Sequence, residues 1–419
     1  MTTLSLRMSL ASNLRNSVSF SPALLFAGGQ QGAWYDPSDR ATLFQDRFGT
    51  TPVTASGQPV GLMLDKSQGL VSGPELVADN DNEAQVMRNI QGTAVTGTNG
   101  TVTQSTDRAQ SGNNSAKFTA TSDANTSHYV VLGNIPAGVN VKIEGWVYVP
   151  SGGMARCAAV DTSNGSMVEN LTNVRDAWAR FSIIRPSVAA TWPLAFGNPD
   201  AESILGYSFY LDNISIRALP GNHATQATAS KRPTYTEGSG LSWLAFDGAD
   251  DAMQTAAIDF TGADKVSVFA GVRKLSDAAT GVIAEISADA STTNKSFSLY
   301  KSASLTINGA GFISRGTEIR SASATEGLSP PANGVLTGLG DISGDRSLIR
   351  INGVQRAINS LEQGSGNYGN YPLFIGARAG TSLYFNGNLY GLIIAGKLAS
   401  SPEITSSESY LAQKSGLTL

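Results

Sequence analysis

Short runs of alternating or fully apolar residues recur along the chain from about residue 139, and Gly, Asn, Asp or Pro follows each run. Runs of this length that are rich in β-branched and aromatic residues predict β-strands. We expect these strands at 141–149, 179–184, 207–216, 266–272, 282–286, 297–300, 304–307, 347–351, 373–375 and 389–395.

Three Asn-Gly pairs lie between or beside the predicted strands. Asn and Gly both tolerate the positive φ that a tight hairpin turn requires. We therefore expect antiparallel hairpins with turns at Asn308-Gly309, Asn352-Gly353 and Asn386-Gly387.

The stretch 402–414 carries the one predicted helix. Pro402 follows Ser401 as proline follows an N-cap residue, and Gly416 is placed to end the helix. Many short strands with a single terminal helix indicate an all-β protein. We expect two antiparallel β-sandwich or jelly-roll domains and a short C-terminal helix.

Composition narrows the classes of function. The chain has 419 residues, enough for two or three domains, and a net charge of -4 without a run of Lys or Arg. Nucleic-acid binding, which depends on counterion release by clustered cations, is therefore disfavoured. No apolar stretch approaches the ~18 residues of a membrane span, so no membrane insertion is expected. Cys157 is the one cysteine, which excludes an intrachain disulfide, and we expect it to be buried.

The first 29 residues hold short apolar patches interrupted by Ser and Asn, with Arg7 and Arg15 among them. This pattern fits a secretory signal poorly. We expect 1–29 to be a segment that docks the protein onto another protein.

The C-terminal half, from about 241 to 419, resembles the laminin-G or concanavalin A-like jelly rolls of phage and bacterial surface proteins. The stretches that carry the resemblance are 244–248 (LAFDG) with Asp250 and Asp251, 266–272, 348–354 (LIRINGV), 373–376 (LFIG) and 385–387 (FNG). In that family they are an opening strand, a central strand, a hairpin ladder and the last two strands. The resemblance implies a jelly roll across this whole half.

A second resemblance joins two distant parts of the chain. The segments 34–67 and 221–235, which contain WYDPS, LDKS, GNHATQ and RPTY, look like consecutive parts of one opening module in phage sandwich proteins. In that module DKS runs almost directly into GNHATQ, whereas 68–220 separates them here. A domain can enter a surface loop because loop-closure entropy grows slowly with loop length. We expect a discontinuous jelly roll, 30–67 plus 221–419, interrupted by an inserted domain, 68–220.

The inserted segment resembles the jelly-roll carbohydrate-binding modules attached to glycoside hydrolases. The matching stretches are 109–118 (AQSGNNSAKF), 141–149 (VKIEGWVYV), 176–181 (DAWARF) and 209–216 (FYLDNISI). The resemblance implies that this jelly roll binds a glycan.

Exposed aromatic side chains are the candidates for sugar contacts, because binding modules stack apolar sugar faces on aromatic rings. Trp192 is the first candidate, since 190–193 (ATWP) has the composition of a loop. Trp146 and Trp178 lie inside predicted strands, where a place in the core is the simpler interpretation. The further candidates are Tyr129, Tyr148 and Tyr207.

A calcium ion is a weaker hypothesis for the inserted segment. In sugar-binding relatives an acidic residue at the position of Asp212 helps to hold structural calcium, with Asp107 and Asn114 as candidate partners here. Hard cations need several oxygens, so a salt link or turn hydrogen bond at Asp212 is favoured. We expect no other cofactor.

Three acidic residues in the C-terminal half, Asp247, Asp250 and Asp251, admit two interpretations. They could bind calcium, or their side chains could cap a hairpin turn by bonding to the backbone. The cap is favoured.

Catalysis is not expected. His128 and His223 are the only histidines, and neither belongs to a nucleophile elbow or a spaced metal motif. His223 is expected to order the loop in which it lies. A glycosidase needs two carboxyls facing each other across a cleft. Nothing in the sequence spacing pairs the glutamates Glu144, Glu169, Glu202 and Glu285.

The resemblances favour a bacteriophage virion protein, such as a tail-fibre, tail-tip or head-fibre component on the virion surface, that helps attachment to host glycans. The expected partners are other virion proteins through the N-terminal segment, host-surface glycans, and further copies of the chain, with a homotrimer as the first guess by analogy. Three alternatives stay open: a ligand-free capsid or tail decoration protein, a bacterial surface adhesin, and a glycan depolymerase.

Overall fold

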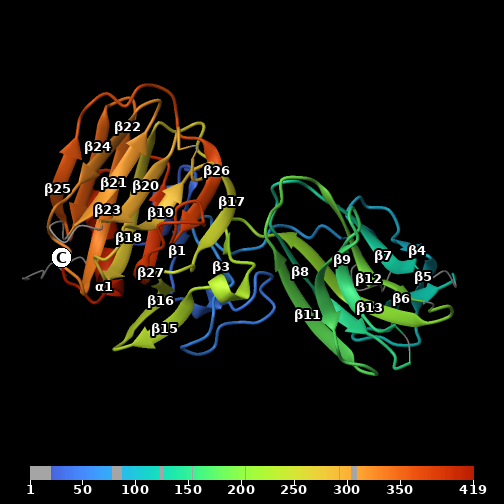
Figure 1. Ribbon diagram of the computed structural model, residues 1–419. Helices are drawn as coiled ribbons and strands as arrows, with labels where there is room; N and C mark the ends of the chain where they lie inside the picture. The colour runs from blue at the N-terminus through green and yellow to red at the C-terminus, as the bar shows by residue number, and fades with distance from the viewer. Residues whose placement is uncertain are drawn as a thin grey trace, which may run out of the picture.

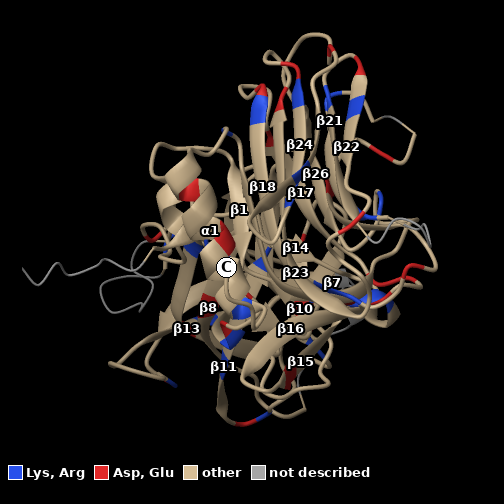
Figure 2. Cartoon of the chain, turned by 90° about the vertical axis from the view of Figure 1, so that its left-hand side faces the viewer, with Lys and Arg blue, Asp and Glu red and all other residues tan. Residues whose placement is uncertain are grey.

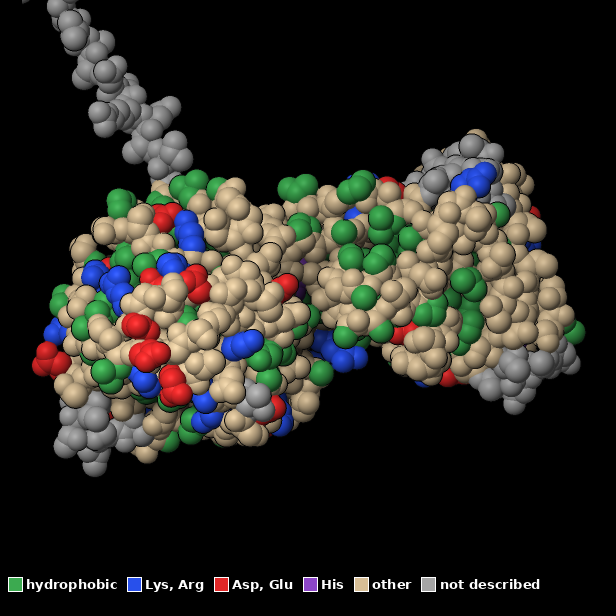
Figure 3. Space-filling model, turned by 90° about the horizontal axis from the view of Figure 1, so that it is seen from above, with side chains coloured by type: hydrophobic (Ala, Val, Ile, Leu, Met, Phe, Trp, Pro, Cys, Tyr) green, Lys and Arg blue, Asp and Glu red, His purple; other side chains and the backbone are tan. Residues whose placement is uncertain are grey.

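The computed structural model describes residues 20–77, 87–122, 126–152, 154–202, 204–291, 293–302 and 309–419. These residues form two lobes, which we call the AB lobe and the CD lobe after their sheets (Figure 1). Viewed from above, the two lobes meet at a narrower waist (Figure 3). The predicted fold class, antiparallel jelly-roll sandwiches with a short C-terminal helix, is confirmed.

Sheet A lies in the AB lobe and has eight strands. In spatial order they are β15 (Thr234–Gly238), β16 (Leu241–Asp247), β27 (Asn386–Ala395), β18 (Lys265–Lys274), β23 (Ala332–Asp341), β24 (Arg346–Ile351) and β25 (Val354–Asn359), with β1 (Gly32–Tyr35) also paired to β27.

Sheet B packs against sheet A and has nine strands. In spatial order they are β2 (Leu43–Phe44), β3 (Leu62–Met63), β14 (Ala224–Thr225), β17 (Met253–Asp259), β26 (Asn370–Ile375), β19 (Gly281–Ile286), β20 (Phe297–Lys301), β21 (Ala310–Arg315) and β22 (Ile319–Ser323). The inward side chains of both sheets form one core, which includes Tyr35, Phe246, Phe297, Phe312 and Leu392.

The CD lobe consists of two five-stranded sheets. Sheet C has the order β11 (Trp178–Arg185), β8 (Val141–Tyr148), β13 (Ser208–Ala218), β6 (Ser115–Ala120) and β5 (Gly100–Ser105). Sheet D has the order β10 (Ser166–Thr172), β9 (Cys157–Asp161), β12 (Trp192–Glu202), β7 (Thr126–Ile135) and β4 (Thr96–Thr98). Their facing sides bury a second core around Phe118, Phe181, Phe196 and Phe209, and Cys157 lies fully buried within it.

The helix α1 (Ser401–Lys414) covers the outer face of sheet A together with the short 3-10 helix η1 (Pro22–Phe26), where Leu25, Phe269 and Leu411 pack together. The backbone N–H of Ser400 donates to Glu403 Oε2 at 2.8 Å, which caps the helix start. Two further 3-10 turns are η2 (Arg40–Thr42) and η3 (Ala229–Lys231). Of the predicted docking segment 1–29, residues 1–19 lie outside the described residues.

The segments 34–67 and 221–223 are tied together by the buried carboxylate of Asp65. It accepts hydrogen bonds from the backbone N–H groups of Trp34 and Asn222, both at 2.7 Å. The N–H of Asp65 in turn donates to His223 Nδ1 at 3.1 Å. Strands from 32–63 therefore share sheets A and B with strands from 224–395, while strands from 96–218 form sheets C and D. The domain boundaries that we derived from the sequence stay a prediction.

The strand and turn predictions can be compared with this topology. Nine of the ten predicted strands overlap observed ones, and 304–307 lies outside the described residues, as does Asn308. Asn352 and Gly353 form the predicted turn between β24 and β25, with φ of 52° and 78°. The turn predicted at Asn386-Gly387 is wrong, because both residues belong to β27 opposite β16. Glycine is needed there for close approach, since a Cβ at Gly387 would lie 2.4 Å from the carbonyl oxygen of Arg273.

Charged side chains are scattered over both lobes, with positive and negative residues interspersed (Figure 2). Within the described ranges, none of the helices has the length and apolar character that crossing a membrane requires.

Candidate functional site

Trp192 does not lie in an exposed loop. It begins β12, opposite Ile135 of β7, and only 2% of its surface is exposed. Trp192, Leu194 and Phe196 alternate along the strand and all face the core between sheets C and D. The guanidinium of Arg185 covers the ring, 3.6 Å from its centroid. The expectation of exposure is therefore wrong, because the loop-like composition of 190–193 applies only to the residues before the strand.

The other predicted sugar contacts do not gather around Trp192. Tyr129 lies in β7 and is buried with Ala158, Val160 and Ala195. Tyr207 precedes β13 and is 42% exposed. Tyr148 projects from sheet C. The structure therefore places the four candidates at separate locations, and their binding roles stay predictions.

Tyr148 belongs to an aromatic cluster on the outer face of sheet C. Along β8, Val141, Ile143 and Val147 face the core, so Trp146 and Tyr148 face outward. Trp178 and Tyr210 lie directly beside Tyr148 on the neighbouring strands β11 and β13. The rings of Trp178 and Tyr210 meet that of Tyr148 edge to face, at centroid distances of 5.8 Å and 6.0 Å. We call Trp146, Tyr148, Trp178 and Tyr210 the aromatic face.

The two tryptophans of the aromatic face are partly exposed, whereas the two tyrosines are buried. The core position expected for Trp146 and Trp178 is therefore wrong for both. For Trp146 the sequence VKIEGWVY already indicated the outward position, because its alternation places Trp146 and Tyr148 on the same side of the strand as Lys142 and Glu144.

Cations cover the tyrosines of the aromatic face. The guanidinium of Arg108 lies 4.2 Å from the ring centroid of Tyr148, and Lys117 Nζ lies 5.5 Å from that of Tyr210. Beside Trp146, Arg180 donates to Glu144 Oε1 at 2.9 Å. The face thus combines partly exposed indole rings with charged groups that can donate and accept hydrogen bonds.

Asp212 holds the loop that carries Arg108. Its buried Oδ2 accepts from the backbone N–H groups of Gln110 and Ser111 at 2.8 Å and 3.2 Å. Asp107 instead pairs with Lys117 at 2.6 Å, and this hydrogen bond lowers the pKa of the Asp107 carboxyl. Asn114 ends the same loop just before β6. The turn hydrogen bonds favoured for Asp212 are present, and calcium at this loop stays a prediction.

Two of the three clustered acidic residues in the AB lobe, Asp247 and Asp251, also accept hydrogen bonds from backbone N–H groups. Asp247 Oδ1 accepts from Ala249 N at 2.8 Å, and Asp251 Oδ2 accepts from Asp247 N at 3.0 Å. Burial raises the pKa of Asp251 to about 7. The carboxylates of Asp247, Asp250 and Asp251 lie within 4.8 Å of one another. Their hydrogen bonds are those of the favoured turn cap.

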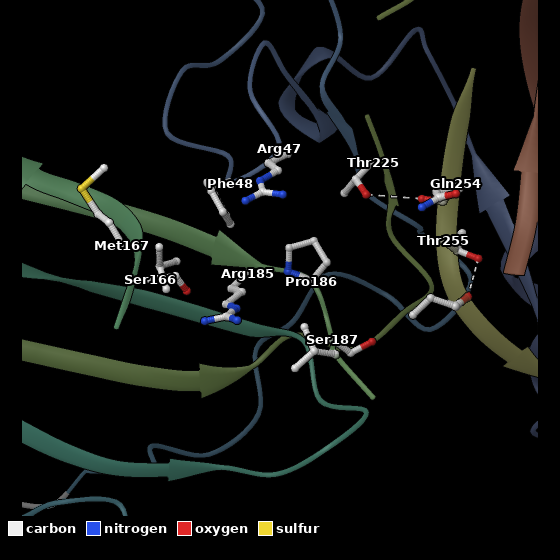
Figure 4. A pocket seen from close by; sticks show the side chains of 13 residues that line it. Arg47, Phe48, Ser166, Met167, Arg185, Pro186, Ser187, Thr225, Gln254 and Thr255 are labelled. Atoms are coloured by element: carbon white, nitrogen blue, oxygen red, sulfur yellow. Dashed lines mark hydrogen bonds between the residues drawn. The ribbon is translucent and has the colours of Figure 1, made fainter. Parts of the chain in front are cut away.

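A cleft of about 360 Å³ lies where the two lobes meet (Figure 4). Arg47 and Phe48 line it from the AB lobe, and Arg185 and Pro186 line it from the end of β11. The N–H of Ile184 donates to the carbonyl of Phe48 at 2.6 Å, which joins the lobes directly. Arg185 donates to Asp161 Oδ2 at 3.0 Å. These contacts tie the cleft to the joint between the lobes.

The residues weighed for catalysis are dispersed. His223 is buried, and burial lowers its pKa to about 4, so its neutral ring accepts the hydrogen bond from Asp65. His128 is buried in β7. Glu144, Glu169 and Glu285 lie on three different sheets, in β8, β10 and β19 respectively. The absence of catalysis stays a prediction.

No protein-family model matches the chain, and no curated protein matches its sequence. Several solved structures are similar to part of it. The CBM40 module of the Ruminococcus gnavus IT-sialidase, bound to α2,3-sialyllactose, is 16% identical over 34% of this chain and 80% of its own, with a TM-score of 0.29. The receptor-binding domain of botulinum neurotoxin mosaic serotype C/D is 13% identical over 40% and 42%, with a TM-score of 0.31.

A mutant of the NanB sialidase from Streptococcus pneumoniae is 14% identical over 36% of this chain and 27% of its own, with a TM-score of 0.28. The jelly-roll fold of both lobes follows from this chain's own strand order.

Proposed function

We propose that the chain is a noncatalytic glycan-binding protein and that the aromatic face holds the sugar. The observation that carries the proposal is the partial exposure of Trp146 and Trp178 on the outer face of a jelly-roll sheet. A sugar ring has an apolar C–H face that stacks on indole, and its hydroxyls bind charged groups at the edge.

The charged neighbours of the tryptophans are placed to bind the hydroxyls of the sugar. Glu144 accepts from Arg180 at 2.9 Å and forms an ion pair with Lys142 at 2.9 Å, so the three side chains form a network beside Trp146. A glycan hydroxyl placed on Trp146 can donate to the carboxylate and accept from either cation. Because an exposed stacking contact is worth only about 1 kcal/mol, binding by one copy is expected to be weak.

We further propose that the protein belongs to a phage virion, as a tail or head-surface component that helps attachment. The laminin-G-like and opening-module resemblances of the AB lobe support this assignment. In such a particle, oligomeric display multiplies weak contacts. Electron microscopy of antibody-labelled phage particles tests it: label on tails or heads is expected, and label confined to the bacterial envelope would favour the adhesin.

The glycan proposal is tested with the full chain on a glycan array, followed by affinity measurements on the strongest ligand. Trp178→Ala is expected to weaken binding about tenfold, which corresponds to roughly 1.4 kcal/mol. The matched control is Trp243→Ala, which removes a partly exposed tryptophan from the AB lobe. Binding that survives Trp178→Ala and Trp146→Ala unchanged overturns the site. An array without any ligand would favour the decoration protein.

A further inference from the structure

A second, smaller cavity lies on the outer face of sheet B, in the AB lobe. It has a volume of about 160 Å³, and side chains of β19, β20 and β21 form its floor. Core residues alternate with cavity residues along these strands. In β20, Phe297 and Leu299 face the core, whereas Ser298 and Tyr300 face the cavity. The cavity is smaller than the roughly 300 Å³ at which drug-sized pockets begin. It therefore admits one ring-sized group rather than a chain.

The polar floor of the cavity contains a buried carboxylate. Glu285 is 4% exposed. Its Oε1 accepts from Ser287 Oγ at 2.7 Å and from the N–H of Ala379 at 3.3 Å. Both bonds fix the carboxylate, which keeps further acceptor capacity, since an ionised carboxylate offers about four lone-pair directions.

Arg378 lines the same cavity and brings a guanidinium group. Burial raises the pKa of the Glu285 carboxyl, and the positive charge of Arg378 opposes that rise. A guanidinium carries five N–H donors, which can bond to oxygen atoms of a ligand. The cavity thus offers an acceptor at Glu285 and a donor at Arg378, and the two opposite charges balance.

The walls of the cavity are aliphatic. Ile319 and Leu383 are 45% and 40% exposed, and both line the cavity with Val282 and Ile313. Tyr300 stands beside them, and its hydroxyl bonds with those of Ser321 and Ser323 at 3.0 Å and 2.9 Å, which fixes the ring.

The loop that forms the rim is held in a strained conformation. Ala379 and Leu383 have φ of 47° and 48°, in the left-handed region that residues with a side chain seldom adopt. The backbone bonds Arg378 N to Ser382 O and Val282 N to Leu383 O, both at 2.8 Å, hold the loop. This conformation brings the Ala379 N–H to Glu285 and the Leu383 side chain to the cavity. Such strain is typical of binding sites.

We propose that this cavity binds a single neutral sugar unit. Glu285 accepts hydrogen bonds from two adjacent hydroxyls, the guanidinium of Arg378 donates to a sugar oxygen, and Ile319 and Leu383 cover the C–H face of the ring. Balanced charges and aliphatic walls fit a neutral polyhydroxylated ring better than an ion. The site lies in the other lobe from the aromatic face, so it extends the proposed function and can succeed or fail separately.

The test is calorimetric or saturation-transfer NMR titration of the full chain with glucose, galactose, mannose and N-acetylglucosamine. At least one is expected to bind, and Glu285→Gln is expected to weaken that binding at least tenfold. The matched control is Glu326→Gln, since the Glu326 side chain is 75% exposed outside the cavity and pairs with Arg356. Trp178→Ala is expected to leave this binding intact, which separates the cavity from the aromatic face.

The proposal is overturned if none of the four sugars binds, or if Glu285→Gln leaves their binding unchanged. Binding of free amino acids in place of sugars would overturn the ligand class, because their paired charges also suit Glu285 and Arg378. If Glu285→Gln fails to fold, Ile319→Ala decides, since this exposed wall residue is not needed for the core and its loss must still weaken sugar binding.

Discussion

Sheets C and B each have an outer face with a candidate binding site, and the two faces differ in how loops cover them. On sheet C the aromatic side chains of β8, β11 and β13 meet on the sheet surface, and a loop lays Arg108 over them. On sheet B a polar floor is walled by the loop from Arg378 to Leu383, which closes a cavity around Glu285. An open face suits part of an extended glycan, and a walled cavity suits one unit. The covering loop therefore decides what each sheet can hold.

The largest expected effect is on the stability of the CD lobe, and it distinguishes a residue of the core from the residues of the aromatic face. Trp192→Ala is expected to lower the free energy of unfolding of this lobe by about 3–5 kcal/mol, because a buried ring leaves a cavity. Glycan affinity of the folded variant should stay within twofold of the wild type. Denaturant unfolding and binding titrations measure the two quantities. Trp192→Phe, which keeps most of the volume, is the control. A loss of affinity without a loss of stability would show that Trp192 contacts the ligand.

The next effect concerns the AB lobe at acid pH. Burial lowers the pKa of His223 to about 4, below its value in the unfolded chain, so folding favours the neutral ring. The contribution of the neutral His223 ring to the free energy of unfolding is complete above pH 6.5 and is lost as pH falls toward 4. It amounts to roughly 3 kcal/mol at about 1.4 kcal/mol per pKa unit. Urea unfolding at pH 7 and pH 4.5 measures it.

The control for that experiment is His223→Gln, which keeps an acceptor for the N–H of Asp65 without titrating. Its stability should fall less than that of the wild type between the two pH values. An equal fall in both proteins would contradict the assignment to His223.

A smaller effect tests the loop over the aromatic face. Asp212→Ala removes the acceptor of the backbone N–H groups of Gln110 and Ser111 and is expected to lower stability by about 1–3 kcal/mol, while Asp107→Ala changes it little. Thermal unfolding with and without added calcium measures both variants. Equal melting temperatures of the wild type in the two buffers are expected from the turn hydrogen bonds. A rise with calcium that Asp212→Ala abolishes would instead establish the metal site.

An effect comparable in size to that of His223, but with the opposite pH dependence, is expected at Asp251, just before β17. Its pKa is raised to about 7, so the folded state favours the neutral acid, and this stabilisation is lost as pH rises from about 4 to 7. Asp251→Asn, which is always neutral, should therefore exceed the wild type in stability above pH 7 and approach it near pH 4. Thermal melts across this range measure the difference, and a difference independent of pH would contradict the assignment.

Much of the fold could be predicted, because strand runs such as 141–149 and 266–272 carry their own periodicity. The turn predicted at Asn352-Gly353 was correct, because a tight turn depends on neighbouring residues alone. The turn predicted at Asn386-Gly387 was wrong, because glycine is needed there for the close approach of β18 to β27, which the local sequence does not show. The contacts of Asp65 with Trp34 and Asn222 lie far apart in sequence, and only the family resemblance brought those segments together.

The candidate sites were harder to predict than the fold. Trp192 was judged by its neighbours in sequence, although its burial follows from pairing between β12 and β7. Trp146 and Trp178 were assigned to the core although the alternation of β8 points Trp146 outward. Glu285 was weighed only as half of a catalytic pair. Its cavity depends on Arg378, which lies in a loop more than ninety positions later, and no local pattern connects them.

The most direct test of the aromatic face uses the five tryptophans of the chain as reporters. Each contributes one indole N–H signal to an ¹⁵N-¹H NMR spectrum, which single substitutions assign. Titration with the strongest glycan from the array is predicted to shift the signals of Trp146 and Trp178 and to leave that of Trp243 in place. Shifts confined to Trp243, or to none of the five, at saturating ligand would contradict glycan binding at this face.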